Sequence, residues 1–368
     1  MKNVLKWTLM ALVVASVLVI ARDPAKWLSR WQPLTVSGTI ELPASYYEPR
    51  TPVEGGNQPP APREDPAAES LSASALQSAA EYAASQDSLA LIVTRHGYIV
   101  FEKYWKGSSL DTVVDSRGLG RVVAALATGV AISERKIGWP DEPVGYLKSE
   151  WAQDPRGTIT VRNLLQLSSG LDGHRVAAAP PGTRWLDQPV DPDLLAEVIQ
   201  KATGMPYAQY LSQSIWRPIG AGDASLWLGS GGLPHADEGF FARQGDWLRV
   251  AELLLHNGNY QGNEVIIPRW VPQMLQPSQT NPGYGSYVRL GGARPSAYAT
   301  DDVLVVDGHG SRLWLVPSLE IAILRTGGPV GRDWDDGRIP NLIVRGAKDY
   351  VPAAARPGAD LRLLVPNH

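Results

Sequence analysis

Residues 115–132 read DSRGLGRVVAALATGVAI. From residue 122 onward only Thr128 and Gly129 interrupt a run of apolar side chains, so the segment has no polar face at helical spacing. A helix that is apolar on all sides is buried on all sides, and this stretch therefore predicts the central helix of the fold. Asp115 and Ser116 precede it as candidate N-terminal caps.

The segments around this helix predict an α+β chain. Apolar residues recur at helical spacing over residues 67–88, and they alternate over residues 89–105 as in a hairpin with a turn at 95–97. A second helix is predicted to begin at Asp191-Pro192 and to stop at Gly204. Apolar strands are predicted at residues 303–306, 313–316 and 321–324. Helix and hairpin come first, helices follow in the middle, and strands come last. Because single strands do not alternate with single helices, the order argues against a parallel α/β sheet.

Charge and composition exclude several function classes. Residues 1–40 hold five of the 34 basic and one of the 37 acidic side chains, which leaves 29 basic and 36 acidic side chains in the rest. That net charge of −7 is a poor match to nucleic acid, which is not expected as a partner. With no cysteine and no metal spacing among the six histidines, the sequence predicts neither a metal site nor a cofactor.

The first 21 residues predict a signal anchor or a signal peptide. Lys2 and Lys6 precede an apolar run at residues 7–21, whose helix would reach about 22 Å. This length is typical of a signal peptide, but the residues around Ala21 offer no small-x-small cleavage site. We favour an uncleaved anchor over a removed signal. Either one places the domain on the periplasmic or extracytoplasmic side of the cell envelope, and the anchor makes the membrane a partner.

Composition sets the remaining boundaries. Seven of the residues between 49 and 62 are proline or glycine, so residues 22–66 are interpreted as a juxtamembrane and proline-rich linker. The folded domain is expected at residues 67–355, with a C-terminal tail at 356–368.

Six segments in order resemble the serine β-lactamase superfamily, in particular its class C-like esterases and 6-aminohexanoate-dimer hydrolases. These segments are residues 91–105, 132–150 (ISERKIGWPDEPVGYLKSE), 158–171 (TITVRNLLQLSSGL), 181–183, 257–268 and 307–326 (DGHGSRLWLVPSLEIAILRT). The resemblance covers roughly residues 70–350. It implies a β-lactamase/transpeptidase-like fold, in which the N- and C-terminal segments build an antiparallel sheet flanked by helices, beside an all-helical region.

The same resemblance implies three catalytic positions, and this chain departs from the pattern at each. The family's Ser-x-x-Lys aligns with residues 118–121, which puts Gly118 at the serine and Arg121 at the lysine. The motif tyrosine aligns with Asp187. The third motif keeps its form as residues 308–311, Gly-His-Gly-Ser.

Each replacement removes a chemical function. Gly118 has no oxygen to form an acyl intermediate. Arg121 stays a cation because its pKa lies above about 12, so it cannot act as a base near neutral pH. Asp187 is too short and of the wrong charge for the proton relay of a tyrosine. The remaining pocket is expected to favour anions, and Arg121 and Asp187 are expected to form an ion pair within about 6 Å.

Other side chains near these positions are candidates for the pocket. Ser116 could replace the nucleophile after a small shift in register, with helix capping as the alternative. Trp185, which could equally pack in the core, Gln188, His309 and Ser311 are further candidates to line the pocket.

Two functions remain open. The first is a membrane-anchored envelope protein with a degenerate hydrolase site, which binds a small-molecule or peptide-like ligand or acts as a scaffold. The second is an active hydrolase of esters, lactams or small amides that uses Ser116, His309 or a water molecule activated by Asp187. Restoring serine, lysine and tyrosine at positions 118, 121 and 187 is expected to create esterase activity if the pocket is open.

Overall fold

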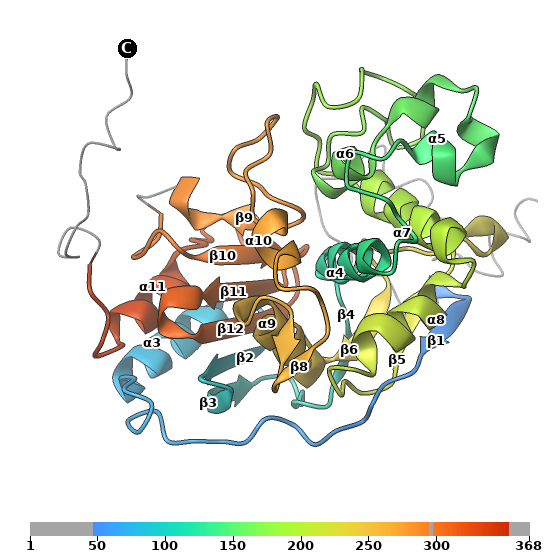
Figure 1. The fold of residues 1–368 in the computed structure, drawn as a ribbon. Coiled ribbons are helices and arrows are strands. Elements are labelled where there is room, and N and C mark those ends of the chain that lie inside the picture. Colours follow the sequence, from blue (N-terminus) through green and yellow to red (C-terminus); the bar gives the residue numbers. More distant parts are fainter. Residues whose placement is uncertain (1–46, 294–296, 353–368) are drawn as a thin grey trace, which may run out of the picture. The chain divides into compact units, whose positions relative to one another are not determined.

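The structure, a computed structural model, describes residues 47–293 and 297–352, and among these the residues from Arg50 onward form one compact unit (Figure 1). The predicted anchor at residues 1–21, most of the predicted linker and the tail at 356–368 lie outside the described residues. Among the residues described, no helix combines the length and the apolar character needed to cross a membrane.

A six-stranded antiparallel sheet joins the two ends of the domain. Its strand order is β3-β2-β12-β11-β10-β9, from Tyr98–Tyr104, Ser88–Arg95, Ile321–Gly327, Arg312–Val316, Leu304–Asp307 and Arg289–Leu290. β2 pairs with β12 from the Arg95–Ile321 pair to the Ser88–Gly327 pair. The predicted α+β fold, with its sheet built from N- and C-terminal segments, is confirmed.

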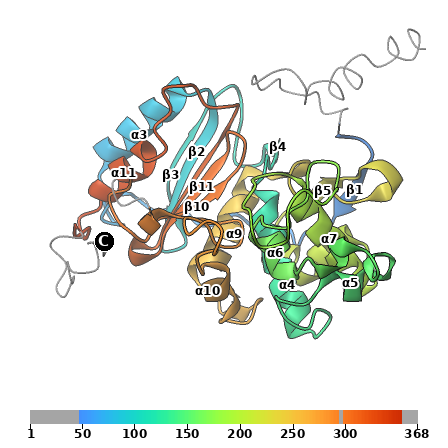
Figure 2. The ribbon, with the colours of Figure 1, turned by 90° about the horizontal axis from the view of Figure 1, so that it is seen from above.

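Helices cover both faces of this sheet, as Figure 2 shows. Along β2, Leu91 and Val93 belong to the apolar core that includes α3 (Ala73–Ser85) and α11 (Arg338–Arg345). Ala90 and Ile92 belong to the other core, with α9 (Gln244–Leu255). This alternation follows from the two-residue period of a strand, which sends successive side chains to opposite faces.

A second region is built around α4 (Gly120–Ser133). The other helices here are α5 (Val144–Leu147), α6 (Val161–Leu165), α7 (Val190–Thr203), α8 (Tyr207–Leu211) and α10 (Trp270–Met274). Every α4 residue from Gly120 to Ala131 is buried, as its apolar sequence predicts. α7 ends at Gly204, which adopts the left-handed conformation with φ +68°.

The segment predicted as a linker contributes to the fold. Arg50–Val53 forms β1 and pairs with β5 (Ala224–Trp227) in a sheet of order β1-β5-β6-β4, completed by β6 (Phe240–Arg243) and β4 (Val113–Asp115). The folded unit therefore begins near Arg50 and not at residue 67. Proline excludes a helix but not an edge strand, where a missing N–H is tolerated, and Val53 anchors the strand with a fully buried side chain. A short hairpin of β7 (Asn259–Tyr260) and β8 (Asn263–Glu264) follows α9.

Helix α4 owes its contact with α10 to a glycine. The indole N–H of Trp270 donates to the Ala125 carbonyl at 2.9 Å, and a Cβ added at Gly129 would lie 2.2 Å from the indole ring. The tryptophan therefore packs directly on the helix backbone.

We expect Gly129→Ala to destabilise the protein by about 1–3 kcal/mol, because the methyl group overpacks this contact. Helix propensity alone predicts the opposite sign, a gain of about 1 kcal/mol. Urea unfolding measures the difference, and Gly173→Ala, at an exposed glycine with open surroundings, is the control. A more stable Gly129→Ala variant would contradict the packing shown here.

Candidate functional site

The three positions aligned with catalytic residues converge at the N-terminal end of α4. Arg121 lies in the first turn of the helix, and its Nη1 is 2.5 Å from Oδ1 of Asp187. The ion pair predicted from the sequence is therefore present. The Nε of Arg121 also donates to Asp237, which precedes β6 and was not predicted.

The two carboxylates differ in their exposure. The side chain of Asp237 is 1% exposed and that of Arg121 is 8% exposed, whereas Asp187 is 41% exposed. Burial alone would lower the pKa of Arg121, but the charges and hydrogen bonds of Asp237 and Asp187 hold it above its ordinary value. Arg121 is thus a permanent cation whose charge is neutralised inside the protein by two carboxylates. The sequence predicted that this charge would favour an anionic ligand, but the carboxylates already occupy it.

The turn before α4 leaves little room for a side chain at position 118. Arg117 and Gly118 both have positive φ, at +48° and +101°. A Cβ at Gly118 would lie 3.2 Å from the Asp307 carbonyl oxygen and 3.2 Å from Cα of Gly308. The N–H of His309 donates to the Arg117 carbonyl at 2.5 Å. The end of β10 is therefore packed against the turn where the resemblance places the nucleophile.

Ser116 does not cap the helix. Helix α4 begins at Gly120 with Leu119 at its N-cap position, and the Ser116 hydroxyl instead points to the carbonyl of Asp237 at 3.5 Å. Its side chain is fully buried. The predicted cap is wrong: Arg117 and Gly118, both with positive φ, separate Ser116 from the helix, and α4 has no side-chain hydrogen bond at its N-cap.

The predicted lining residues have separate roles. His309 is 55% exposed, with Nδ1 3.6 Å from Oε1 of Glu238, while Ser311 is buried. The side-chain amide of Gln188 donates to the Leu171 carbonyl at 2.7 Å. Trp185 packs against Tyr284 with ring centroids 5.0 Å apart.

Tyr284 is a neighbour of this centre that the sequence did not reveal. Its hydroxyl donates to Oδ2 of Asp307 at 3.2 Å. Burial, together with the charge of Asp307, raises the pKa of Tyr284 well above its ordinary value, so the phenol stays protonated. A tyrosine from a distant loop therefore lies near the third motif, but it acts as a donor to a carboxylate.

A network of ion pairs fixes Asp307, the residue that precedes the third motif at residues 308–311. Arg289 and Arg312 both contact Asp307 at 3.0 Å, and both also pair with Asp336. Burial raises the pKa of Asp307, whereas the two arginines outweigh burial at Asp336 and lower its pKa. These contacts fix the strand end that closes over Gly118.

The centre is rich in carboxyl groups. Asp191, at the start of α7, accepts hydrogen bonds from both the N–H and the hydroxyl of Ser169, yet burial raises its pKa to about 7. Burial and the charges of Asp237 and Asp115 raise the pKa of Glu238 to about 7. In the part of the chain that the structure describes, no group of three or more histidine or acidic side chains could hold a metal ion.

Comparisons with known proteins agree with this fold. A 6-aminohexanoate-dimer hydrolase of Paenarthrobacter ureafaciens is 24% identical to this chain over 208 residues. The aligned residues cover 54% of this chain and 48% of that protein, so the chain spans about half the length of this relative. Among solved structures, a Bacillus anthracis protein assigned as a 6-aminohexanoate-dimer hydrolase superposes with a TM-score of 0.65 at 17% identity, covering 77% of this chain and 86% of that one.

A beta-lactamase from Mycobacterium bovis superposes with a TM-score of 0.58 at 21% identity, covering 72% of this chain and 96% of that one. At these identities the two structures show a shared fold. The beta-lactamase family model matches residues 77–323, which is more than half of the sequence. The chain therefore belongs to the beta-lactamase family.

Proposed function

We propose that this protein has the beta-lactamase fold without its acyl-enzyme chemistry, and that it acts as a binding or scaffold protein. The observation that carries the proposal is the contact at Gly118, where a Cβ would meet Asp307 and Gly308 at 3.2 Å. An acyl intermediate needs a side-chain nucleophile and space in front of it for a carbonyl carbon. Gly118 has no such side chain, and the 3.2 Å contacts leave little space around it.

The ion cluster supports the same proposal. A catalytic base must take up and release a proton, and Arg121 is held charged by two carboxylates. Breaking this cluster to admit a substrate would leave Asp237 buried without its cation, which is unfavourable. Arg121 is therefore best explained as a structural group that fills the former position of the base.

An active hydrolase with a different nucleophile is the alternative. Ser116 is a poor candidate because its side chain is fully buried, whereas His309 and Asp187 are accessible to solvent. The similarity to 6-aminohexanoate-dimer hydrolase makes a short linear amide the first substrate to try.

The proposed location is the cell envelope, with the domain on the extracytoplasmic side and the first 21 residues as its membrane anchor. This part of the proposal rests on the apolar run at residues 7–21, which lies outside the described residues.

We expect neither a fluorophosphonate nor a fluorescent penicillin to label the full-length chain, because both reagents need an activated serine. Intact-mass spectrometry measures the adduct, with an active serine β-lactamase as positive control. Hydrolysis of 6-aminohexanoate dimer, a p-nitrophenyl ester and a chromogenic cephalosporin is followed in parallel. Stoichiometric labelling of any serine, or turnover above the heat-denatured chain, would support the hydrolase instead.

Restoring the catalytic residues is expected to fail. The triple variant Gly118→Ser, Arg121→Lys, Asp187→Tyr should show no esterase activity, since serine is strained by about 1–2 kcal/mol at φ +101° and its Cβ meets the end of β10. The double variant Arg121→Lys, Asp187→Tyr is the matched control for p-nitrophenyl ester hydrolysis. A folded triple variant that is faster than this control would mean that the site can open.

The two carboxylates that bind Arg121 should differ in their effect on stability. Asp237→Asn removes a buried partner and is expected to lower the free energy of unfolding by about 3–5 kcal/mol. Asp187→Asn removes a half-exposed partner and is expected to lower it by at most about 1 kcal/mol. Urea unfolding measures both, and equal losses would contradict a structural role centred on Asp237.

A further inference from the structure

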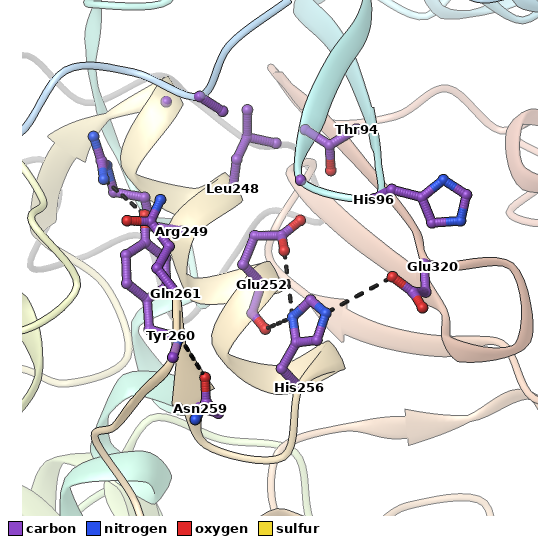
Figure 3. Close-up of a pocket in the computed structure, with 14 residues that line it drawn as sticks. Thr94, His96, Leu248, Arg249, Glu252, His256, Asn259, Tyr260, Gln261 and Glu320 are labelled. Atoms are coloured by element: carbon purple, nitrogen blue, oxygen red, sulfur yellow. Dashed lines mark hydrogen bonds and ion pairs between the residues drawn. The ribbon is translucent and has the colours of Figure 1, made fainter. Parts of the chain in front are cut away.

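A cavity of about 310 Å³ lies between the sheet and helix α9 (Figure 3). It is formed by the end of β2, the turns that follow β2 and β11, helix α9 and the β7–β8 turn. Among its lining residues are Thr94, His96, Leu248, Glu252, His256 and Glu320.

The cavity is separate from the Gly118 centre. Arg325 donates to the hydroxyl of Ser88 and to the carbonyl of Gly310, which places the third motif beside the first residue of β2. Thr94 lies six residues further along this strand, or about 20 Å away at the rise of an extended chain. Binding at this cavity is therefore independent of whether the Gly118 centre is inactive.

Two buried oxygen atoms at this cavity lack a hydrogen-bond partner among the described residues. Thr94 is 1% exposed, and its Oγ1 is unpaired, as is Oε1 of Glu252. Thr94 follows Ile92 by two positions in β2, so its side chain points toward α9, as that of Ile92 does. Since buried polar atoms are ordinarily paired, both oxygens indicate a site for a hydrogen-bonding molecule.

The charges at this site favour a cation. His256 lies between two carboxylates, with Nδ1 3.4 Å from Oε2 of Glu252 and Nε2 3.8 Å from Oε2 of Glu320. The one arginine in the lining, Arg249, donates from Nη1 and Nη2 to backbone carbonyls and to a tyrosine hydroxyl, and its Nε lies 3.9 Å from Oδ1 of Asp246, which opposes its charge. Burial raises the pKa of Glu252, which means that its charge is incompletely compensated.

We propose that this cavity binds a small organic cation, namely a primary ammonium group on a short aliphatic body. The ammonium group has three donors and would serve the two unpaired oxygens of Glu252 and Thr94 once these side chains rotate toward the cavity, because both atoms are buried beneath its wall. Leu248 and Ala61 supply apolar wall for the aliphatic part. The volume lies at the lower end of the range for small-molecule pockets, about 300–1,000 Å³, and so suits a ligand of a few heavy atoms.

Three probes of equal length test the proposal on the full-length chain. n-Butylammonium is expected to bind saturably with 1:1 stoichiometry in calorimetry, and to shift the backbone amide NMR signals of residues 94–97 and 252. n-Butanol and butyrate, which are neutral and anionic, are expected to bind at least tenfold more weakly. Equal binding of n-butanol, or no saturable binding of n-butylammonium, would overturn the proposal in favour of a water-filled cavity.

Two variants locate the binding to the proposed atoms. Glu252→Gln keeps the size of the side chain and removes its charge, and should weaken n-butylammonium binding at least tenfold. Thr94→Val keeps the shape and removes the hydroxyl, and should weaken binding about threefold or more without lowering the melting temperature. Glu81→Gln, on the exposed face of α3, is the control and should bind as the parent does.

Unchanged affinity in the folded Glu252→Gln variant would overturn the assignment. If Glu252→Gln does not fold, the Thr94→Val variant tests the assignment instead. Unchanged affinity for n-butylammonium in that variant would also overturn it.

Discussion

The closed contact between the end of β10 and the turn before α4 is the constraint on which the local structure around Gly118 depends. The His309 N–H bonds the Arg117 carbonyl, and Cα of Gly308 lies against the space that a side chain at Gly118 would occupy. The resemblance aligns this turn with the nucleophile of the family, so the contact lies at the position where the resemblance implies the reaction. The glycine at 118 suits the contact sterically, since a side chain there would press on the end of β10.

The charged groups around this contact follow from the same closure. A buried arginine must have partners, and Arg121 has one carboxylate inside the protein and one at its surface. On the other side, Asp307 and Asp336 share Arg289 and Arg312, which fix the strand end. The two networks hold the two sides of this contact, so opening it would disturb buried charges on both sides.

Much of the fold could be predicted because its signals are local. The apolar run of α4, the alternation of β2 and β3, and the glycine stop of α7 depend on neighbouring residues. The Arg121–Asp187 pair was predictable because both replace members of one group in contact. Asp237 was not, since 116 residues separate it from Arg121 and no motif marks it. β1 was missed because proline-rich composition describes an edge strand and a linker equally well.

Buried polar atoms without a hydrogen-bond partner among the described residues occur at both ends of the sheet. At the Gly118 end, Arg121 pairs with its carboxylates and the backbone groups of Arg117 and His309 bond each other, while Oδ2 of Asp237 and Nε of Arg289 are unpaired. At the Thr94 end, a hydroxyl and a carboxylate oxygen are buried beside a cavity without partners among the described residues. An unpaired buried oxygen gains from a ligand that can reach it, and at the Thr94 end a cavity adjoins the two residues that carry such oxygens. If this protein binds a small molecule there, the cavity gives that molecule room away from the Gly118 turn.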